Sequence, residues 1–373
     1  MDVYRELETG RRGRMDVIRT VDMHTSGEPT RIVVEGYPEL MGKTLLEKRA
    51  YAREKLDFIR RRLMFEPRGH AGMYGAILVK ETELTESGEA DIGVLFCHNE
   101  GYSTMCGHAT IALGRFLVDT QDRGVFPRRG QVRYEEGKKE TVVRVHAPCG
   151  VVEVTVPTVE EGGRRRSDEG KRVRFTSVAS FVGGLGVAVR TLGGRTARVD
   201  VGYGGAFYAI VDANELGLHG RLRECATLQA ECAALKAALG SWDASALVEH
   251  PQHAELEYVY GIIVVDGELA VCVFADGQID RSPCGSGVCA RLAVAVARGS
   301  VAVGERRPFH SPVSAADPAS VFLGRAVEST ALVGRSGREW AAVRVEVEGR
   351  ASYTGAHALV AEDSDRLPPF LVL

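Results

Sequence analysis

Two cysteines each stand directly before a glycine at the start of an apolar, helix-like stretch. Cys106 precedes Gly107, and Cys284 precedes Gly285. The first backbone N–H groups of a helix have no intrahelical partner and carry the positive end of the helix dipole, so they stabilise a thiolate. This placement predicts that the pKa of each thiol falls toward neutrality. Such a thiol can remove a proton as thiolate and return one as thiol.

The backbone beside each cysteine is predicted to bind an anion. Glycine has no Cβ, so a ligand can approach the main chain closely. The free N–H groups expected to hold a carboxylate belong to Gly107, His108, Gly285 and Ser286. A base and an acid beside a bound carboxylate suit removal of the proton on the adjacent carbon. We therefore expect both cysteines to face one small substrate.

The elements that must position these cysteines follow a repeated order. Alternating apolar residues predict strands at 16–22, 31–35, 76–79 and 91–96, then a helix at 107–119. Later strands at 258–265 and 269–274 lead to a helix at 287–298. Further helices are expected at 45–63 and 224–239, and the charged run 162–171 is interpreted as a linker or exposed loop.

This order predicts an α+β fold built from two pseudo-symmetric, strand-rich halves, each with a central helix. The first half would span 16–165, joined by the C-terminal segment 340–373, and would carry Cys106. The second half would span 172–335 and carry Cys284. The active site is expected between the halves.

Composition excludes several classes of protein. The chain has 373 residues, 45% of them hydrophobic and 26% charged, which is typical of a globular protein with two domains. A net charge of −3 gives no general attraction to nucleic acid or anionic lipid. No apolar run is long enough for a membrane span and the N-terminus lacks a signal-peptide core, so we expect a cytoplasmic protein.

The eight cysteines are dispersed and lack the paired spacing of a zinc site, and the histidines are scattered, so no metal site is expected. The six cysteines other than Cys106 and Cys284 are interpreted as small buried hydrophobes.

Five stretches of the chain closely resemble the proline racemase family. That family includes proline racemases, hydroxyproline 2-epimerases and trans-3-hydroxy-L-proline dehydratases. The stretches are residues 22–28, 64–70, 105–108, 203–209 and 280–287. The resemblance implies a fold similar to diaminopimelate epimerase, no cofactor, a small-molecule substrate and a homodimer.

The resemblance assigns roles residue by residue. Cys106 and Cys284 match the family's two acid/base thiols. Positions that bind the substrate carboxylate through backbone N–H groups match Gly107, His108, Gly285 and Ser286. His108 and Asp280 match side chains near the ring nitrogen. A thiolate on one face of Cα and a thiol on the other would invert that carbon without a cofactor.

The choice between branches of the family depends on three positions. Over its length the chain looks most like the dehydratases, but that branch usually has Thr or Ser where this chain has Cys284. A hydroxyl transfers protons less well than a thiol, so Cys284 favours a racemase or 2-epimerase. Tyr74 and Phe274 match aromatic pocket positions, and the Tyr74 hydroxyl could bond to a ring hydroxyl. Proline and hydroxyproline both fit. The alternative is a trans-3-hydroxy-L-proline dehydratase, with or without additional epimerase activity.

Two other functions are less consistent with the sequence. Cys106 and His108 could form the nucleophile and base of a thiol hydrolase, but their i, i+2 spacing argues against this. A hydrolase would also leave the second Cys-Gly stretch unexplained. A non-catalytic binding module would not require both thiols. The Gly183–Gly186 stretch lacks full dinucleotide-binding spacing, so no nicotinamide site is expected.

Overall fold

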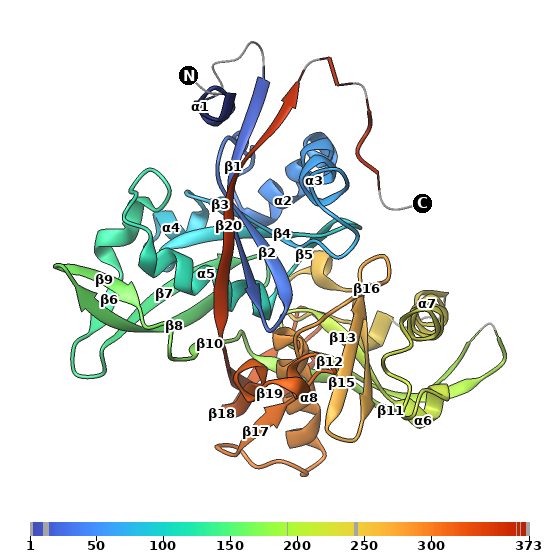
Figure 1. Cartoon of the computed structure of the whole chain (residues 1–373). Helices are drawn as coiled ribbons and strands as arrows, with labels where there is room; N and C mark the ends of the chain where they lie inside the picture. Colours follow the sequence, from blue (N-terminus) through green and yellow to red (C-terminus); the bar gives the residue numbers. More distant parts are fainter. Residues whose placement is uncertain are drawn as a thin grey trace.

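The computed structural model describes residues 3–9, 15–191, 193–241, 245–362, 364–365 and 367–370. The fold is α+β, with two strand-rich groups that each surround one helix (Figure 1).

The strands are β1 (Met15–Thr25), β2 (Glu28–Glu35), β3 (Gly75–Val79), β4 (Ile92–Cys97), β5 (Tyr102–Ser103), β6 (Arg133–Glu135), β7 (Glu140–Ala147), β8 (Gly150–Glu161), β9 (Arg164–Ser167), β10 (Val173–Thr176), β11 (Ser180–Arg190), β12 (Thr196–Tyr203), β13 (Phe207–Asp212), β14 (Val259–Asp266), β15 (Leu269–Phe274), β16 (Gln278–Ile279), β17 (Arg306–Phe309), β18 (Phe322–Val333), β19 (Glu339–Gly349) and β20 (Ala351–Glu362). The α-helices are α1 (Val3–Thr9), α2 (Leu45–Lys55), α3 (Asp57–Met64), α4 (Glu83–Glu86), α5 (Gly107–Asp119), α6 (Ala213–Leu216), α7 (Cys225–Ser241) and α8 (Gly285–Ala297).

The two halves repeat one arrangement of strands before their central helix. In the first half, β2 runs parallel to β3, β3 pairs antiparallel with β4, and β4 with β5, after which α5 begins. In the second half, β13 runs parallel to β14, β14 pairs antiparallel with β15, and β15 with β16, after which α8 begins. Both helices have 13 residues. The predicted duplication is confirmed.

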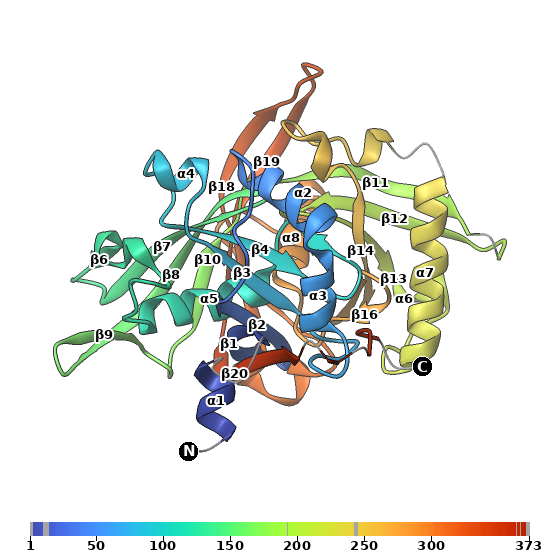
Figure 2. The same ribbon diagram turned by 90° about the horizontal axis from the view of Figure 1, so that it is seen from above.

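Each central helix is enclosed by strands. α5 contacts β1, β2, β8 and β10, and α8 contacts β11, β12, β18 and β19. Because strands cover several faces of each helix, α5 and α8 are apolar almost all round, as expected of buried helices. α7 instead lies along the outer side of the second half, against β14 (Figure 2).

The chain crosses between the halves through strands. β10 pairs with β8 on one side and with β19 on the other. After β19 the chain turns at Arg350, and β20 pairs along its length with β1 (Figure 1). Strand pairing thus places the return to the first half at Ala351. The division into domains 16–165 with 340–373 and 172–335 stays a prediction, and 371–373 lie outside the described residues.

The helix expected over 45–63 is wrong as a single element. α2 ends and α3 begins around Leu56, whose φ of −123° and ψ of 11° are not helical. α2 buries Leu45 and Ala52, whereas α3 buries Ile59 and Leu63 together with its neighbours. Leu45, Ala52, Ile59 and Leu63 keep the spacing of one helix face, so the apolar pattern continues across the break at Leu56 and does not reveal it.

The charged stretch 162–171 forms the turn and second strand of an exposed hairpin and the segment that leads to β10. β8 and β9 pair antiparallel from Thr158 with Ser167 to Glu161 with Arg164. Gly162 and Gly163 make the turn, and both have positive φ, which glycine adopts without strain.

Candidate active site

The N-termini of α5 and α8 abut between the two halves. A Cβ on Gly107 would lie 2.5 Å from the Cα of Gly285, and a Cβ on Gly285 would lie 2.9 Å from the Cα of Gly107. Only glycine fits at either position without displacing the facing backbone. The partner-free N–H groups of two helices therefore converge on one place, which favours an anionic ligand there.

One small cavity lies at this junction. It is lined by all nine residues that the sequence singled out: Tyr74, Cys106, Gly107, His108, Phe274, Asp280, Cys284, Gly285 and Ser286. Its volume is about 10 Å³, close to that of a single water molecule. The structure thus brings these residues together in a closed site, and their individual roles stay predictions.

Sequence reasoning missed three residues of the cavity, Met105, Tyr208 and Tyr260. The Tyr208 hydroxyl lies 2.7 Å from Ser286 Oγ and 3.8 Å from Cys284 Sγ. Tyr260 stacks on Phe274 with ring centroids 5.5 Å apart. A usable signal was present, because a tyrosine within an apolar strand needs a partner for its hydroxyl.

Cys106 caps the helix that it precedes. Its sulfur accepts a hydrogen bond from the Ala109 N–H at 3.4 Å and lies 3.2 Å from His108 Nδ1. Burial raises the pKa of Cys106 well above its usual value, and the opposing effects of the Ala109 N–H and the Tyr74 hydroxyl are smaller. The prediction of a lowered thiol pKa is therefore wrong for Cys106. Desolvation by burial raises the pKa more than the N–H groups at the start of the helix lower it.

Cys284 is held differently from Cys106. Its φ of 63° and ψ of 88° lie in the left-handed region, which costs a non-glycine residue about 1–2 kcal/mol. Its N–H donates to Ser282 Oγ at 3.1 Å, and the Ser282 N–H donates to Asp280 Oδ1 at 2.8 Å. Its sulfur makes no capping bond to α8. A hydrogen-bonded loop thus holds the second cysteine in a strained conformation.

The charges around the sulfurs suit a cationic group. Burial raises the pKa of Asp280 to about 6, and hydrogen bonds from Ser282 act against this rise. Burial lowers the pKa of His108 to about 3, so its imidazole is neutral at pH 7. The site therefore combines a carboxylate, a neutral imidazole and two helix N-termini.

Aromatic rings form one wall of the cavity. Tyr74 and Phe274 meet edge to face with centroids 6.0 Å apart, and His108 contacts Tyr74 at 4.8 Å. The Tyr74 hydroxyl is 2.8 Å from Ser103 Oγ, so it already has a partner. This wall suits the carbon atoms of a small ring.

Among the residues that the structure describes, no group of three or more His, Cys, Asp or Glu side chains is placed to hold a metal ion. None of the helices that the structure describes combines the length and apolar character needed to cross a membrane.

Comparison with known proteins places this geometry in a family. The proline racemase family model matches residues 20–370. The chain is 44% identical over 362 residues to mouse (Mus musculus) trans-L-3-hydroxyproline dehydratase, covering 95% of this chain and 94% of that protein. It is 38% identical over 357 residues to a 3-hydroxyproline 2-epimerase from Burkholderia multivorans, covering 94% and 96%. A solved structure of a probable proline racemase from Agrobacterium radiobacter shares 26% identity and a TM-score of 0.76, covering 94% of each chain. The chain belongs to the proline racemase family.

Proposed function

We propose that this protein is a cofactor-independent 2-epimerase of hydroxyproline or proline, with Cys106 and Cys284 as the two acid/base groups. The observation that carries the proposal is that each helix start presents a thiol, and both thiols line the same cavity. A thiolate on one side removes the α-proton, and the thiol on the other side delivers a proton to the opposite face. The reverse reaction exchanges the two roles.

The remaining groups would hold the substrate in place. The substrate carboxylate would be bound by the backbone N–H groups of Gly107, His108, Gly285 and Ser286. The same groups would stabilise the negative charge that develops when the α-proton leaves. Asp280 would pair with the ring ammonium, and the wall formed by Tyr74 and Phe274 would contact the ring carbons. Because burial raises the pKa of Cys106, the substrate ammonium would favour its thiolate by opposing that effect.

Dehydration of trans-3-hydroxy-L-proline is the second candidate, favoured by 44% identity to dehydratases. In that substrate the 3-hydroxyl lies on the same face as the α-hydrogen. One thiolate can therefore remove the α-proton and then donate it to the departing hydroxyl, while the electron pair left at Cα forms the double bond to C3. Water leaves, and the enamine tautomerises to a cyclic imine. Dehydration by this route needs only one thiol. The presence of two, Cys106 and Cys284, therefore favours epimerisation.

Deuterium exchange in heavy water distinguishes these activities. L-Proline, trans-4-hydroxy-L-proline and trans-3-hydroxy-L-proline are incubated in parallel with the enzyme. An epimerase incorporates deuterium at Cα and forms the 2-epimer, whereas a dehydratase converts the 3-hydroxy substrate into a keto acid through the imine. Absence of Cα exchange in all three substrates, together with absence of keto acid from the 3-hydroxy substrate, would overturn both candidates.

Two expectations from the sequence accompany this proposal. We propose a homodimer, which light scattering during size-exclusion chromatography tests, and a cytoplasmic location, which cell fractionation tests. A mass of 40.4 kDa in light scattering would contradict the dimer.

A further inference from the structure

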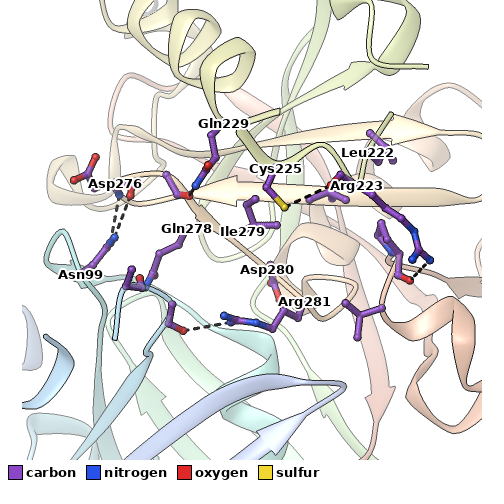
Figure 3. Close-up of a pocket in the computed structure, with 16 residues that line it drawn as sticks. Asn99, Leu222, Arg223, Cys225, Gln229, Asp276, Gln278, Ile279, Asp280 and Arg281 are labelled. Carbon is purple, nitrogen blue, oxygen red and sulfur yellow. Dashed lines mark hydrogen bonds between the residues drawn. The ribbon is translucent and has the colours of Figure 1, made fainter. Parts of the chain in front are cut away.

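A second and much larger cavity adjoins the catalytic cavity. Its volume is about 500 Å³, against about 10 Å³ around the two sulfurs. Asp280 lines both cavities, whereas a cavity of about 560 Å³ beside Arg115 shares no residue with the catalytic one. Figure 3 shows the larger cavity, with Asp280 and Arg281 on one wall and Gln229 and Cys225 across from them. A substrate of several carbon atoms cannot fit the inner cavity unless part of its lining moves. Residues 278–281 line the larger cavity and include Asp280, and we call them the shared wall.

Side chains of the second half attach the shared wall to the first half. Gln278 Nε2 donates to the carbonyl oxygens of Ala71 at 2.6 Å and Met73 at 3.0 Å. Arg281 Nη1 donates to the Gly72 carbonyl at 3.4 Å. These contacts can be broken without disturbing strand pairing. On the opposite side the halves are joined by paired strands, since β10 bonds to both β8 and β19.

A buried carboxylate anchors the same wall. Glu28, on β2 of the first half, accepts hydrogen bonds from the Arg281 N–H at 2.8 Å and from Arg281 Nη1 at 3.0 Å. The Glu28 side chain is 1% exposed, whereas that of Arg281 is 37% exposed. Burial and the neighbouring Asp280 raise the pKa of Glu28 to about 8, although Arg281 acts in the opposite direction. The attachment therefore responds to charge beside Asp280, where the substrate ammonium would lie.

We propose that the larger cavity is the antechamber through which a small zwitterionic imino acid reaches the two cysteines, and that Gln278 and the Glu28–Arg281 pair form its inner gate. This inference rests on the proposed function for the identity of the ligand. Charges of both signs, from Arg281 and Asp276, lie beside the apolar side chains of Ile279 and Val313 in the cavity. Such a lining matches a molecule with a carboxylate, an ammonium and an apolar ring.

A cysteine in the antechamber provides the test. Cys225 was expected to be buried, but it is exposed and lines the antechamber, whereas the other seven cysteines are buried. Cys225 is labelled with N-ethylmaleimide or with a pyrene maleimide, and peptide mass spectrometry verifies the labelled position. The rate at which iodoacetamide then alkylates Cys106 and Cys284 is measured by the same method, without any substrate.

The pyrene label is expected to slow alkylation of both buried thiols at least ~10-fold, with a smaller effect of N-ethylmaleimide. Cys225→Ser protein given the same treatment is the control, compared with its own untreated sample. Val313→Trp, at an exposed position on the cavity wall, obstructs the cavity without labelling and is expected to act in the same direction. Unchanged alkylation rates in both obstructed proteins would overturn the antechamber.

The gate is tested by opening it. At pH 9, above the pKa of Glu28 at about 8, Glu28→Gln removes the charge that holds Arg281. The substitution is then expected to speed alkylation of Cys284 by roughly 3- to 10-fold, as expected for loss of a part-buried ion pair. Asp200→Asn is the control, because the Arg298–Asp200 pair also joins a part-exposed arginine, 48%, to a less exposed carboxylate, 16%, but lies within the second half. Equal alkylation rates in the Glu28→Gln and wild-type proteins would contradict the gate.

These results separate the antechamber from the proposed function. If obstruction slows alkylation but the unobstructed wild-type enzyme exchanges the α-proton of none of the proline substrates, the antechamber is supported and the proposed function is contradicted. If the obstructed enzyme is alkylated at the unobstructed rate and still turns over substrate at the wild-type rate, the proposed function is supported and the antechamber is contradicted.

Discussion

Replacing Gly107 with alanine tests whether the two abutting helix starts act as one site. The new Cβ would lie 2.5 Å from the Cα of Gly285 and 2.9 Å from the N–H nitrogen of Ser286. Carbon atoms normally meet at about 3.5–4.0 Å, so the two helix starts must separate by about 1 Å. The contacted atoms belong to backbone, which cannot rotate away as a flexible side chain could.

The expected effect on activity exceeds the effect on stability. Overpacking of this kind costs about 1–3 kcal/mol. Alanine recovers about 1 kcal/mol of helix propensity, which leaves a net loss of about 0–2 kcal/mol in the free energy of unfolding. Displacing the carboxylate-binding N–H groups by about 1 Å should lower kcat/KM roughly 100-fold, equivalent to about 2.7 kcal/mol.

The assay combines urea unfolding with kcat/KM for the substrate identified by deuterium exchange. Gly240→Ala in α7 is the matched control, because a Cβ there meets nothing within 4 Å. That variant should gain up to about 1 kcal/mol in unfolding free energy and keep wild-type kcat/KM. The reasoning is refuted if Gly107→Ala retains kcat/KM within about 3-fold of wild type, since that would mean that the helix starts tolerate separation.

Three further predictions follow from other contacts. Cys284→Gly should be more stable than Cys284→Ala by about 1 kcal/mol in urea unfolding, because φ is 63° at this position; the usual order, alanine above glycine, would contradict the strain. Burial lowers the pKa of His98 to about 3, so the unfolded chain binds the extra proton and the contribution of His98 to stability should fall by about 1.4 kcal/mol per pH unit below about pH 6.5. His98→Asn should remove this contribution from the slope of unfolding free energy measured from pH 7 to 5, and an unaltered slope would count against it. Arg31→Met leaves the buried carboxylate of Asp22 without its ion-pair partner and should lower the unfolding free energy by about 3–5 kcal/mol in the same assay. A loss under 1 kcal/mol would show that the pair contributes little to stability.

The positions of the central helices could be predicted from the sequence because local signals agree there. At Cys106 a side chain that can cap a helix is followed by a glycine and an apolar run, and α5 indeed begins at Gly107. The same signals predicted α8, which begins at Gly285, two residues earlier than expected. Strand order before each helix followed from the repeat of apolar segments.

Other features depend on tertiary contacts that no local pattern encodes. The break at Leu56 leaves no mark in the apolar pattern, because Leu45, Ala52, Ile59 and Leu63 keep the spacing of one continuous helix face. The hydroxyls of Tyr208 and Tyr260 indicated that each needs a partner, but only the facing helix starts show that both line the cavity. The raised pKa of Cys106 reflects burial by distant segments, which outweighs the local effect of the helix start.

The central claim is that two sulfurs serve opposite faces of one carbon atom. It is tested most directly by Cα deuterium exchange in heavy water with Cys106→Ser and Cys284→Ser, each given the L substrate and its 2-epimer. Each variant should lose epimerisation by roughly 10²- to 10⁴-fold, as expected for loss of one acid/base group. Any remaining exchange should affect one epimer in the first variant and the other epimer in the second. A variant that still epimerises at the wild-type rate, or exchange of the same epimer by both variants, would contradict the account.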